Sequence, residues 1–248
     1  MAVHVEVAGT GERVLLVHGG IMPARMMWSE QRPLASRWRL ELLDRRGFGK
    51  SPPRDAEDFD EDADDLIGVI GDEPVHLVGM SYGGVASVVA AARRPPLRSL
   101  TLIEPPLFSV ARHDAHANAL REELDRLTAD FDSSDVRGWL ERFLPAIGSA
   151  FPLPDPLPEW LDRSARLLHG ARQPWEAEPD LDAVRDTGVP VLVVTGGHSA
   201  GFEAIADALT DRLGAHRATV PGLGHGVPRT GAPFNDVLED HLRRSSRT

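Results

Sequence analysis

The sequence predicts an α/β protein with a mostly parallel central sheet flanked by helices and with an inserted helical lid. The first observation is that short apolar segments of strand length alternate with helix-like stretches. The second is that residues 14–17 and 191–194 are apolar at every position, which is typical of strands covered on both faces. The third is a long stretch in the middle of the chain that has no strand signal.

The predicted strands follow one another through most of the chain. The N-terminal residues 1–7 alternate between apolar and polar side chains, which indicates a strand. Because helix-like stretches separate the later runs, neighbouring strands are expected to be mostly parallel. Apolar runs predict strands in the following segments: residues 13–18, 39–44, 74–80, 97–103, 189–195 and 217–220.

Residues 107–186 have a different pattern. Leucine and aromatic side chains recur at helical spacing, for example at Leu120, Leu124 and Leu127, and prolines interrupt the helical runs. This stretch lies after one predicted strand and before another. We therefore predict a helical cap at residues 107–186, inserted into a core formed by residues 1–106 and 187–248.

Composition limits the classes of function. The 248 residues include 27 Lys and Arg and 38 Asp and Glu, which gives a net charge of −11. This charge argues against a nucleic-acid partner, because binding to phosphates needs clustered positive charge. The absence of cysteine excludes disulfides, thiolate metal sites and a cysteine nucleophile. We find no secretory signal and no apolar run near the roughly 20 residues that span a bilayer. We therefore expect a cytoplasmic protein that acts on a small-molecule substrate, with no membrane partner; the oligomeric state stays open.

An acidic run occupies residues 55–65. Its eight carboxylates raise the possibility of a calcium site. The glycine and glutamate that a calcium-binding loop of the EF-hand type requires are not both present in any frame. We interpret the run as the solvated start of a helix, since carboxylates are favoured near helix N-termini.

The strongest chemical signal is the segment GMSYGG at residues 79–84. It follows an apolar strand and precedes a small-residue helix, which is the context of a G-x-S-x-G nucleophile elbow. Side chains at Gly79 and Gly83 would collide with the neighbouring strand and helix. Ser81 is therefore the predicted nucleophile, against the alternative of a simple glycine-rich turn.

The glycine pair after His18 ends another strand. An acyl-transfer enzyme needs two preorganised donors for the oxyanion of its tetrahedral intermediate. We predict that the backbone N–H groups of Gly20 and Tyr82 form this oxyanion hole, with Ile21 as the substitute for Gly20 if the loop register differs. His18 is interpreted as a residue that orients the loop.

A general base is expected late in the chain. His225 lies in the glycine-rich segment PGLGHG directly after the last predicted strand. A near-neutral pKa allows histidine to take the serine proton and return it to the leaving group. His225 is therefore the predicted base, and a structural loop histidine is the alternative.

Taken in this order, the motifs resemble the α/β-hydrolase family, whose members combine an H-G oxyanion loop, a G-x-S-x-G elbow and a late G-x-G-H loop. Residues 44–51, DRRGFGKS, are similar to the D-x-R-G-x-G-x-S stretch of the esterase and dehalogenase-like branches. The resemblance covers residues 1–106 and 187–248 and implies the α/β-hydrolase fold. For the insertion it implies the position only.

The resemblance also implies where to look for the acid that, together with the serine and the histidine, forms the catalytic triad of this family. Most family members carry an aspartate in a G-x-x-D turn, but residues 196–199 here read GGHS, and the next carboxylate is Glu203. Haloalkane dehalogenase relatives place the acid at the end of the preceding core strand, where this chain has Glu104. A carboxylate there can hold an imidazole in the required tautomer. Glu104 is therefore the predicted acid, with Glu203, a Ser-His dyad or an acid not identified from the sequence as alternatives.

Methionines cluster near the predicted site. Met22, Met80 and the aromatic Trp28 are expected to line an adaptable apolar pocket, because methionine fills irregular space well. The alternative is that Met26, Met27 and Trp28 are packing residues of the first helix.

The function favoured by these motifs is that of a serine hydrolase without cofactor or metal. It would cleave a small-to-medium, mainly apolar carboxylic ester or lactone through an acyl-enzyme on Ser81. Dehalogenases and epoxide hydrolases of the family use aspartate at the elbow, so serine indicates acyl chemistry. Two alternatives remain: the same fold and triad used for C–C cleavage, lyase or cofactor-free oxygenase chemistry, and a non-catalytic ligand-binding protein.

Overall fold

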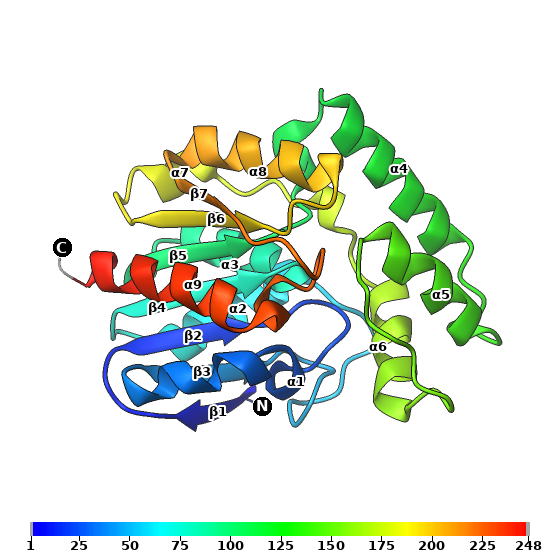
Figure 1. The fold of residues 1–248 in the computed structure, drawn as a ribbon, viewed down its shortest axis with the longest axis horizontal. Coiled ribbons are helices and arrows are strands. Elements are labelled where there is room, and N and C mark those ends of the chain that lie inside the picture. The colour runs from blue at the N-terminus through cyan, green and yellow to red at the C-terminus, as the bar shows by residue number, and fades with distance from the viewer. Residues whose placement is uncertain (1, 247–248) are drawn as a thin grey trace.

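The computed structural model describes residues 2–246, and within them the strands form one seven-stranded sheet (Figure 1). The strand order is β1-β3-β2-β4-β5-β6-β7, and every neighbouring pair is parallel except β1 with β3. The mostly parallel sheet predicted from the sequence is confirmed. The strands are β1 His4–Ala8, β2 Arg13–Val17, β3 Arg39–Asp44, β4 Val75–Met80, β5 Leu97–Ile103, β6 Val191–Thr195 and β7 His216–Thr219.

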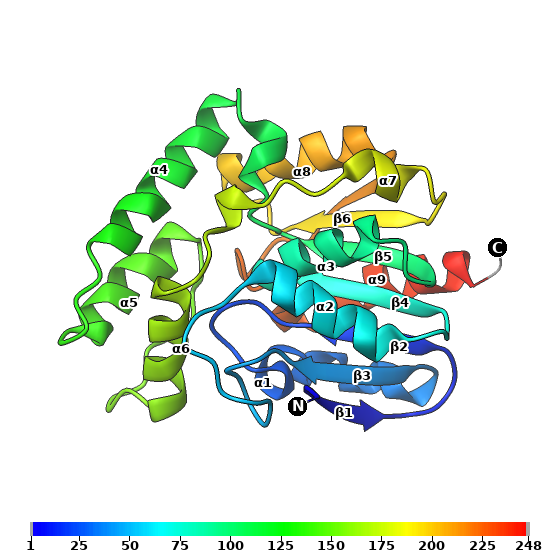
Figure 2. The ribbon, with the colours of Figure 1, turned by 180° about the vertical axis from the view of Figure 1, so that it is seen from behind.

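Both faces of the sheet are covered, which explains the continuous apolar runs. In β2, Leu15 and Val17 belong to one buried cluster, whereas Val14 and Leu16 belong to another. Successive side chains of a strand point to opposite faces, so a strand between two cores must be apolar at each position. Figures 1 and 2 show helices on the two opposite sides of the sheet.

The helices divide between these two faces. On one face lie α2 Phe59–Ile70, α3 Tyr82–Ala92, α7 Leu181–Arg185 and α8 Ala200–Leu213. On the other lie α1 Ala24–Met27 and α9 Ala232–Ser245, together with the 3-10 helix η1 Ser29–Ser36.

The inserted region between β5 and β6 is helical, as predicted. Its main helices are α4 Ala115–Ala129, α5 Val136–Ala146 and α6 Glu159–His169. In Figures 1 and 2 these helices stand beyond the end of the sheet toward which the parallel strands point. Loops that follow the parallel strands therefore face the inserted helices, and ligand sites of open α/β sheets form at this edge.

The acidic run starts a helix, but it is not solvated throughout. Asp58 is the N-cap of α2 and accepts hydrogen bonds from the backbone N–H groups of Asp60 and Glu61. Glu57 and Asp62 are buried and pair with the buried Arg45, each at 2.7 Å. The prediction of a solvated face was wrong for these two carboxylates, because a cation from the loop after β3 packs beneath the helix.

Within residues 2–246, no helix combines the length and apolar character needed to cross a membrane.

Candidate active site

Ser81 lies at the turn between β4 and α3, as the elbow motif predicts. Its backbone has φ 53° and ψ −126°, a conformation that non-glycine residues rarely adopt. A side chain at Gly79 would collide with Ser87 of α3, and one at Gly83 would collide with the carbonyl oxygen of His18. The glycines therefore let β4, α3 and the end of β2 approach closely enough to hold this strained turn.

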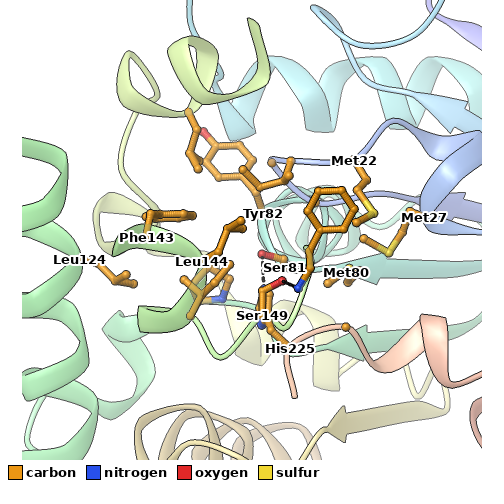
Figure 3. Close-up of a pocket in the computed structure, with 18 of the residues that line it drawn as sticks. Met22, Met27, Met80, Ser81, Tyr82, Leu124, Phe143, Leu144, Ser149 and His225 are labelled. Atoms are coloured by element: carbon orange, nitrogen blue, oxygen red, sulfur yellow. Dashed lines mark hydrogen bonds between the residues drawn. The ribbon is translucent and has the colours of Figure 1, made fainter. Parts of the chain in front are cut away.

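His225 lies next to Ser81, and the two side chains form a hydrogen bond. Its Nε2 lies 3.0 Å from Ser81 Oγ, as the dashed line in Figure 3 marks. The backbone N–H of His225 donates to the carbonyl oxygen of Gly148 at 3.1 Å, so the inserted region helps to hold the histidine loop. The Phe202 ring packs against the imidazole with a centroid distance of 4.8 Å. This geometry suits proton transfer from the serine hydroxyl to Nε2.

Glu104 completes the line of hydrogen bonds. Its Oε2 lies 2.6 Å from His225 Nδ1, and its Oε1 accepts the backbone N–H of Gly196 at 2.6 Å. Burial by itself would raise the pKa of Glu104, but hydrogen bonds from His198, His225 and Gly196 and the charge of His225 lower it to about 2. The carboxylate is therefore ionised at neutral pH, and it fixes the histidine with Nδ1 protonated and Nε2 free to accept a proton.

The structure places the alternative acid elsewhere. Glu203 lies on α8 and accepts a hydrogen bond from Arg217 at 2.5 Å. That carboxylate is engaged with a strand arginine, whereas Glu104 contacts the imidazole.

A second histidine, which the sequence reasoning missed, contacts the same carboxylate. His198 Nε2 lies 2.9 Å from Glu104 Oε2. His198 belongs to the GGHS turn at residues 196–199, where the family usually has its acid. The sequence signal that could have revealed this contact is a histidine in the turn where most family members carry the acid.

Glu104, His198 and His225 offer ligand atoms that all lie within 4.8 Å of one another, as a metal site would require. The 2.6 Å between Glu104 Oε2 and His225 Nδ1 is a hydrogen-bond distance. Two ligands at about 2.1 Å from one ion in tetrahedral geometry would stand about 3.4 Å apart. The arrangement therefore fits a hydrogen-bond network better than a metal centre.

The predicted oxyanion donors lie beside Ser81. Gly20 and Tyr82 line the same cavity as Ser81, and a side chain at Gly19 would press against the serine Cβ. In residues 2–246, the backbone N–H groups of Gly20 and Tyr82 have no hydrogen-bond acceptor. Tyr82 is the first residue of α3, where the N–H groups are free and the helix dipole is positive. Both groups are thus available to an anion.

The loop that carries Gly20 is fixed from behind by His18. Its Nε2 accepts the backbone N–H of Arg45 at 3.0 Å, and its Nδ1 donates to the carbonyl oxygen of Gly19 at 2.7 Å. Burial, together with the nearby Arg45 charge, lowers the pKa of His18 well below its ordinary value. A neutral imidazole that bridges two backbone segments agrees with the loop-orienting role expected for His18.

Arg45 occupies the variable position of the D-x-R-G motif, and the sequence gives it no role. Its guanidinium donates to the carbonyl oxygens of His18 and Gly19, at 3.0 and 2.9 Å. It also lies against the Tyr82 ring, 5.0 Å from the centroid. Arg45 therefore links the glycine loop to the first residue of α3, the two segments that carry the predicted oxyanion donors.

A cavity of about 240 Å³ opens above Ser81 (Figure 3). Met22, Met27 and Met80 lie on one side, and Phe143 and Leu144 of α5 lie on another. Trp28 is not among the lining residues, so its expected pocket role was wrong; it is fully buried in the cluster beneath α1 and α9. Trp28 directly follows α1 and its side chain packs into this cluster, whereas Met27, the last residue of α1, also lines the cavity.

Comparison with known proteins identifies the family. Residues 14–239 match the alpha/beta hydrolase family, so the chain belongs to that family. It is similar to a pimeloyl-[acyl-carrier protein] methyl ester esterase of Aeromonas hydrophila subsp. hydrophila, with 33% identity over 96% of this chain and 98% of that protein. An enzyme of the same name from Aeromonas salmonicida is also 33% identical, over 58% of this chain and 57% of its own length. The structure of MenH from S. aureus superposes with a TM-score of 0.74 at 15% identity, over 98% of this chain and 99% of that one.

Proposed function

We propose that the protein is a serine esterase that cleaves a small-to-medium, mainly apolar carboxylic ester or lactone. The observation that carries the proposal is the hydrogen-bonded line from Ser81 Oγ through His225 to Glu104, at 3.0 and 2.6 Å. Relatives with 33% identity are named as methyl ester esterases, which supports ester hydrolysis on the same fold.

The reaction starts with attack of Ser81 Oγ on the ester carbonyl carbon. The hydroxyl proton passes to His225 Nε2, and Glu104 stabilises the resulting imidazolium. The carbonyl oxygen becomes an oxyanion, which accepts hydrogen bonds from the backbone N–H groups of Gly20 and Tyr82. Collapse of this intermediate breaks the C–O bond, and the departing alcohol takes the proton from Nε2. Water, deprotonated by the same histidine, then attacks the acyl carbon of the acyl-enzyme. The bond from that carbon to Ser81 Oγ breaks, Oγ takes the proton from Nε2, and the carboxylic acid is released.

The cavity indicates the substrate class. Most of its lining side chains are apolar, and several of them come from the inserted helices α4, α5 and α6. Apolar surface of this kind favours an alkyl or aryl acyl group over a charged one. We infer that the inserted helices, residues 107–186, act as a cap over this group.

The proposal is tested by turnover of p-nitrophenyl acetate, butyrate and octanoate, methyl octanoate and γ-octalactone. We expect hydrolysis of at least one ester and no hydrolysis by Ser81→Ala. The matched control is Ser87→Ala, because Ser87 is a buried serine in α3 whose Oγ bonds the Gly83 carbonyl and does not line the cavity. Turnover restricted to highly charged esters would contradict the substrate class, and activity retained in Ser81→Ala would contradict the mechanism.

A further inference from the structure

The Glu104 carboxylate accepts three hydrogen bonds, and the proposed mechanism uses only the one from His225. Gly196 N–H binds Oε1, while His225 Nδ1 and His198 Nε2 both lie against Oε2, at 2.6 and 2.9 Å. The mechanism needs His225 on this oxygen and gives no role to His198.

His198 is enclosed at the place where the inserted region meets the histidine loop. Its side chain is 16% exposed, and the Phe202 ring lies 5.7 Å from it between centroids. On another side it meets Gly148, where a side chain would collide with the imidazole. The carbonyl oxygen of Gly148 also accepts the backbone N–H of His225, and the adjacent Ser149 forms an isolated antiparallel β-bridge with Gly224. The packing thus holds the ring with Nε2 directed at Glu104.

We propose that His198 is a positioning residue whose Nε2–H fixes the Glu104 oxygen that receives the Nδ1–H of His225. This inference rests on the proposed function. Glu104 has φ 43°, a strained left-handed conformation at the end of β5. Without His198, the donors to this carboxylate within residues 2–246 would be Gly196 and His225, and the carboxylate could rotate about its terminal bond. A second fixed donor on Oε2 removes that freedom and keeps the catalytic imidazole aligned with Ser81.

Sharing one oxygen also couples the protons of the two imidazoles. Within residues 2–246, the titratable groups that contact the His198 ring are Glu104 and His225; Phe202 and Gly148 carry no charge. The hydrogen bond from His198 withdraws part of the negative charge on Glu104 Oε2. Less of that charge is then available to stabilise the His225 imidazolium. Loss of His198 should therefore stabilise protonated His225, and the acid limb of the pH–rate profile should move to higher pH.

The test measures the rate of Ser81 labelling by a fluorophosphonate probe between pH 5 and 9. The variants are His198→Ala, His198→Gln and the control His113→Gln, which alters an exposed histidine that does not line the cavity. We expect His198→Ala to label about tenfold more slowly at pH 8, with its acid limb at higher pH. His198→Gln, whose amide donates a hydrogen bond but does not titrate, should stay within about threefold of wild type, as should the control.

Two results overturn the inference: labelling by His198→Ala within twofold of wild type with an unchanged acid limb, or equal losses in the Ala and Gln variants with unchanged limbs. Wild-type protein that does not label contradicts the proposed function instead. A second measurement on the wild-type protein needs neither folding of a variant nor labelling. ¹⁵N NMR of the histidine rings at pH 8 to 9 should show neutral His198 protonated at Nε2, and a proton at Nδ1 would refute the inference.

Discussion

The Oε2 atom of Glu104 lies 2.6 Å from Nδ1 of His225, so the strand-end carboxylate and the loop imidazole form one hydrogen-bonded unit. The two residues are 121 positions apart in the chain. The parallel order of β5, β6 and β7 brings their loops to the same edge of the sheet.

Replacement of this carboxylate should cost most of the activity. We expect Glu104→Gln to lower kcat by about 10³ to 10⁴-fold, because the amide no longer stabilises the imidazolium or selects its tautomer. The pKa of Glu104 is about 2, so the carboxylate is ionised across an assay range of pH 6 to 9 and the loss should persist throughout. Steady-state kinetics of the variant and of the wild type between pH 6 and 9 measure this loss of kcat. Glu203→Gln is the control, and a larger loss in that variant would assign the acid to Glu203.

The strained serine should lower the stability of the fold. Ser81→Ala and Ser81→Gly both remove the nucleophile, but only glycine adopts φ 53° and ψ −126° without steric cost. After allowance for the greater freedom of glycine in the unfolded chain, we expect the Gly variant to be about 1 kcal/mol more stable than the Ala variant. Urea unfolding of the two inactive proteins measures the difference. Equal stability, or a more stable Ala variant, would show that the turn is not strained.

The buried Arg45 cluster should be needed for stability. Arg45→Met leaves Glu57 buried without its cation and leaves Asp62 paired with Arg54 alone, and breaking a buried pair costs about 3–5 kcal/mol. The control is Arg93→Met, because Arg93 pairs with Asp60 and Asp64 on the surface and should contribute less than about 1 kcal/mol. Chemical denaturation at pH 7.5 compares them, and similar small losses in both variants would contradict a buried ion pair.

His241 should make the fold sensitive to acid. Burial, together with the positive charges of His76, His216 and Arg244, lowers its pKa to about 4 from an ordinary value of 6.5. Because the folded pKa is lower, the unfolded chain binds the proton more tightly, and stability falls as pH drops from 6.5 towards 4. Between pH 7.5 and 5 we expect wild type to lose about 2 kcal/mol more than His241→Leu.

Urea unfolding at the two pH values tests this expectation. His113→Leu, which alters an exposed histidine, should lose as much as wild type. An equal loss in wild type and His241→Leu would show that His241 is not held neutral.

The fold was largely predictable because its main strands lie between two cores. Short, mainly apolar runs gave the bounds of β3 and β5 correctly, and those of β2 and β7 to within one residue at each end. The inserted helices were predictable from leucine spacing and prolines. The elbow was predictable because its glycines are local requirements of one turn.

The parts that could not be predicted depend on contacts between distant segments. No local pattern reveals that His198 binds Glu104, or that Arg45 lies buried between the glycine loop and the carboxylates of Glu57 and Asp62. Trp28 was misplaced because a hydrophobic residue of a short helix can face either the core or a cavity. The packing decides between the two, and here it favours the core.

The central claim is that Ser81 forms an acyl-enzyme with the help of His225. The most direct measurement is rapid mixing with p-nitrophenyl butyrate, acid quenching, and peptide mapping by mass spectrometry. We expect a burst of p-nitrophenolate and a butyryl group on the peptide that contains Ser81, with acylation at least about 100-fold slower in His225→Ala. A butyryl group on another residue, or an equal burst in Ser81→Ala, would contradict the claim.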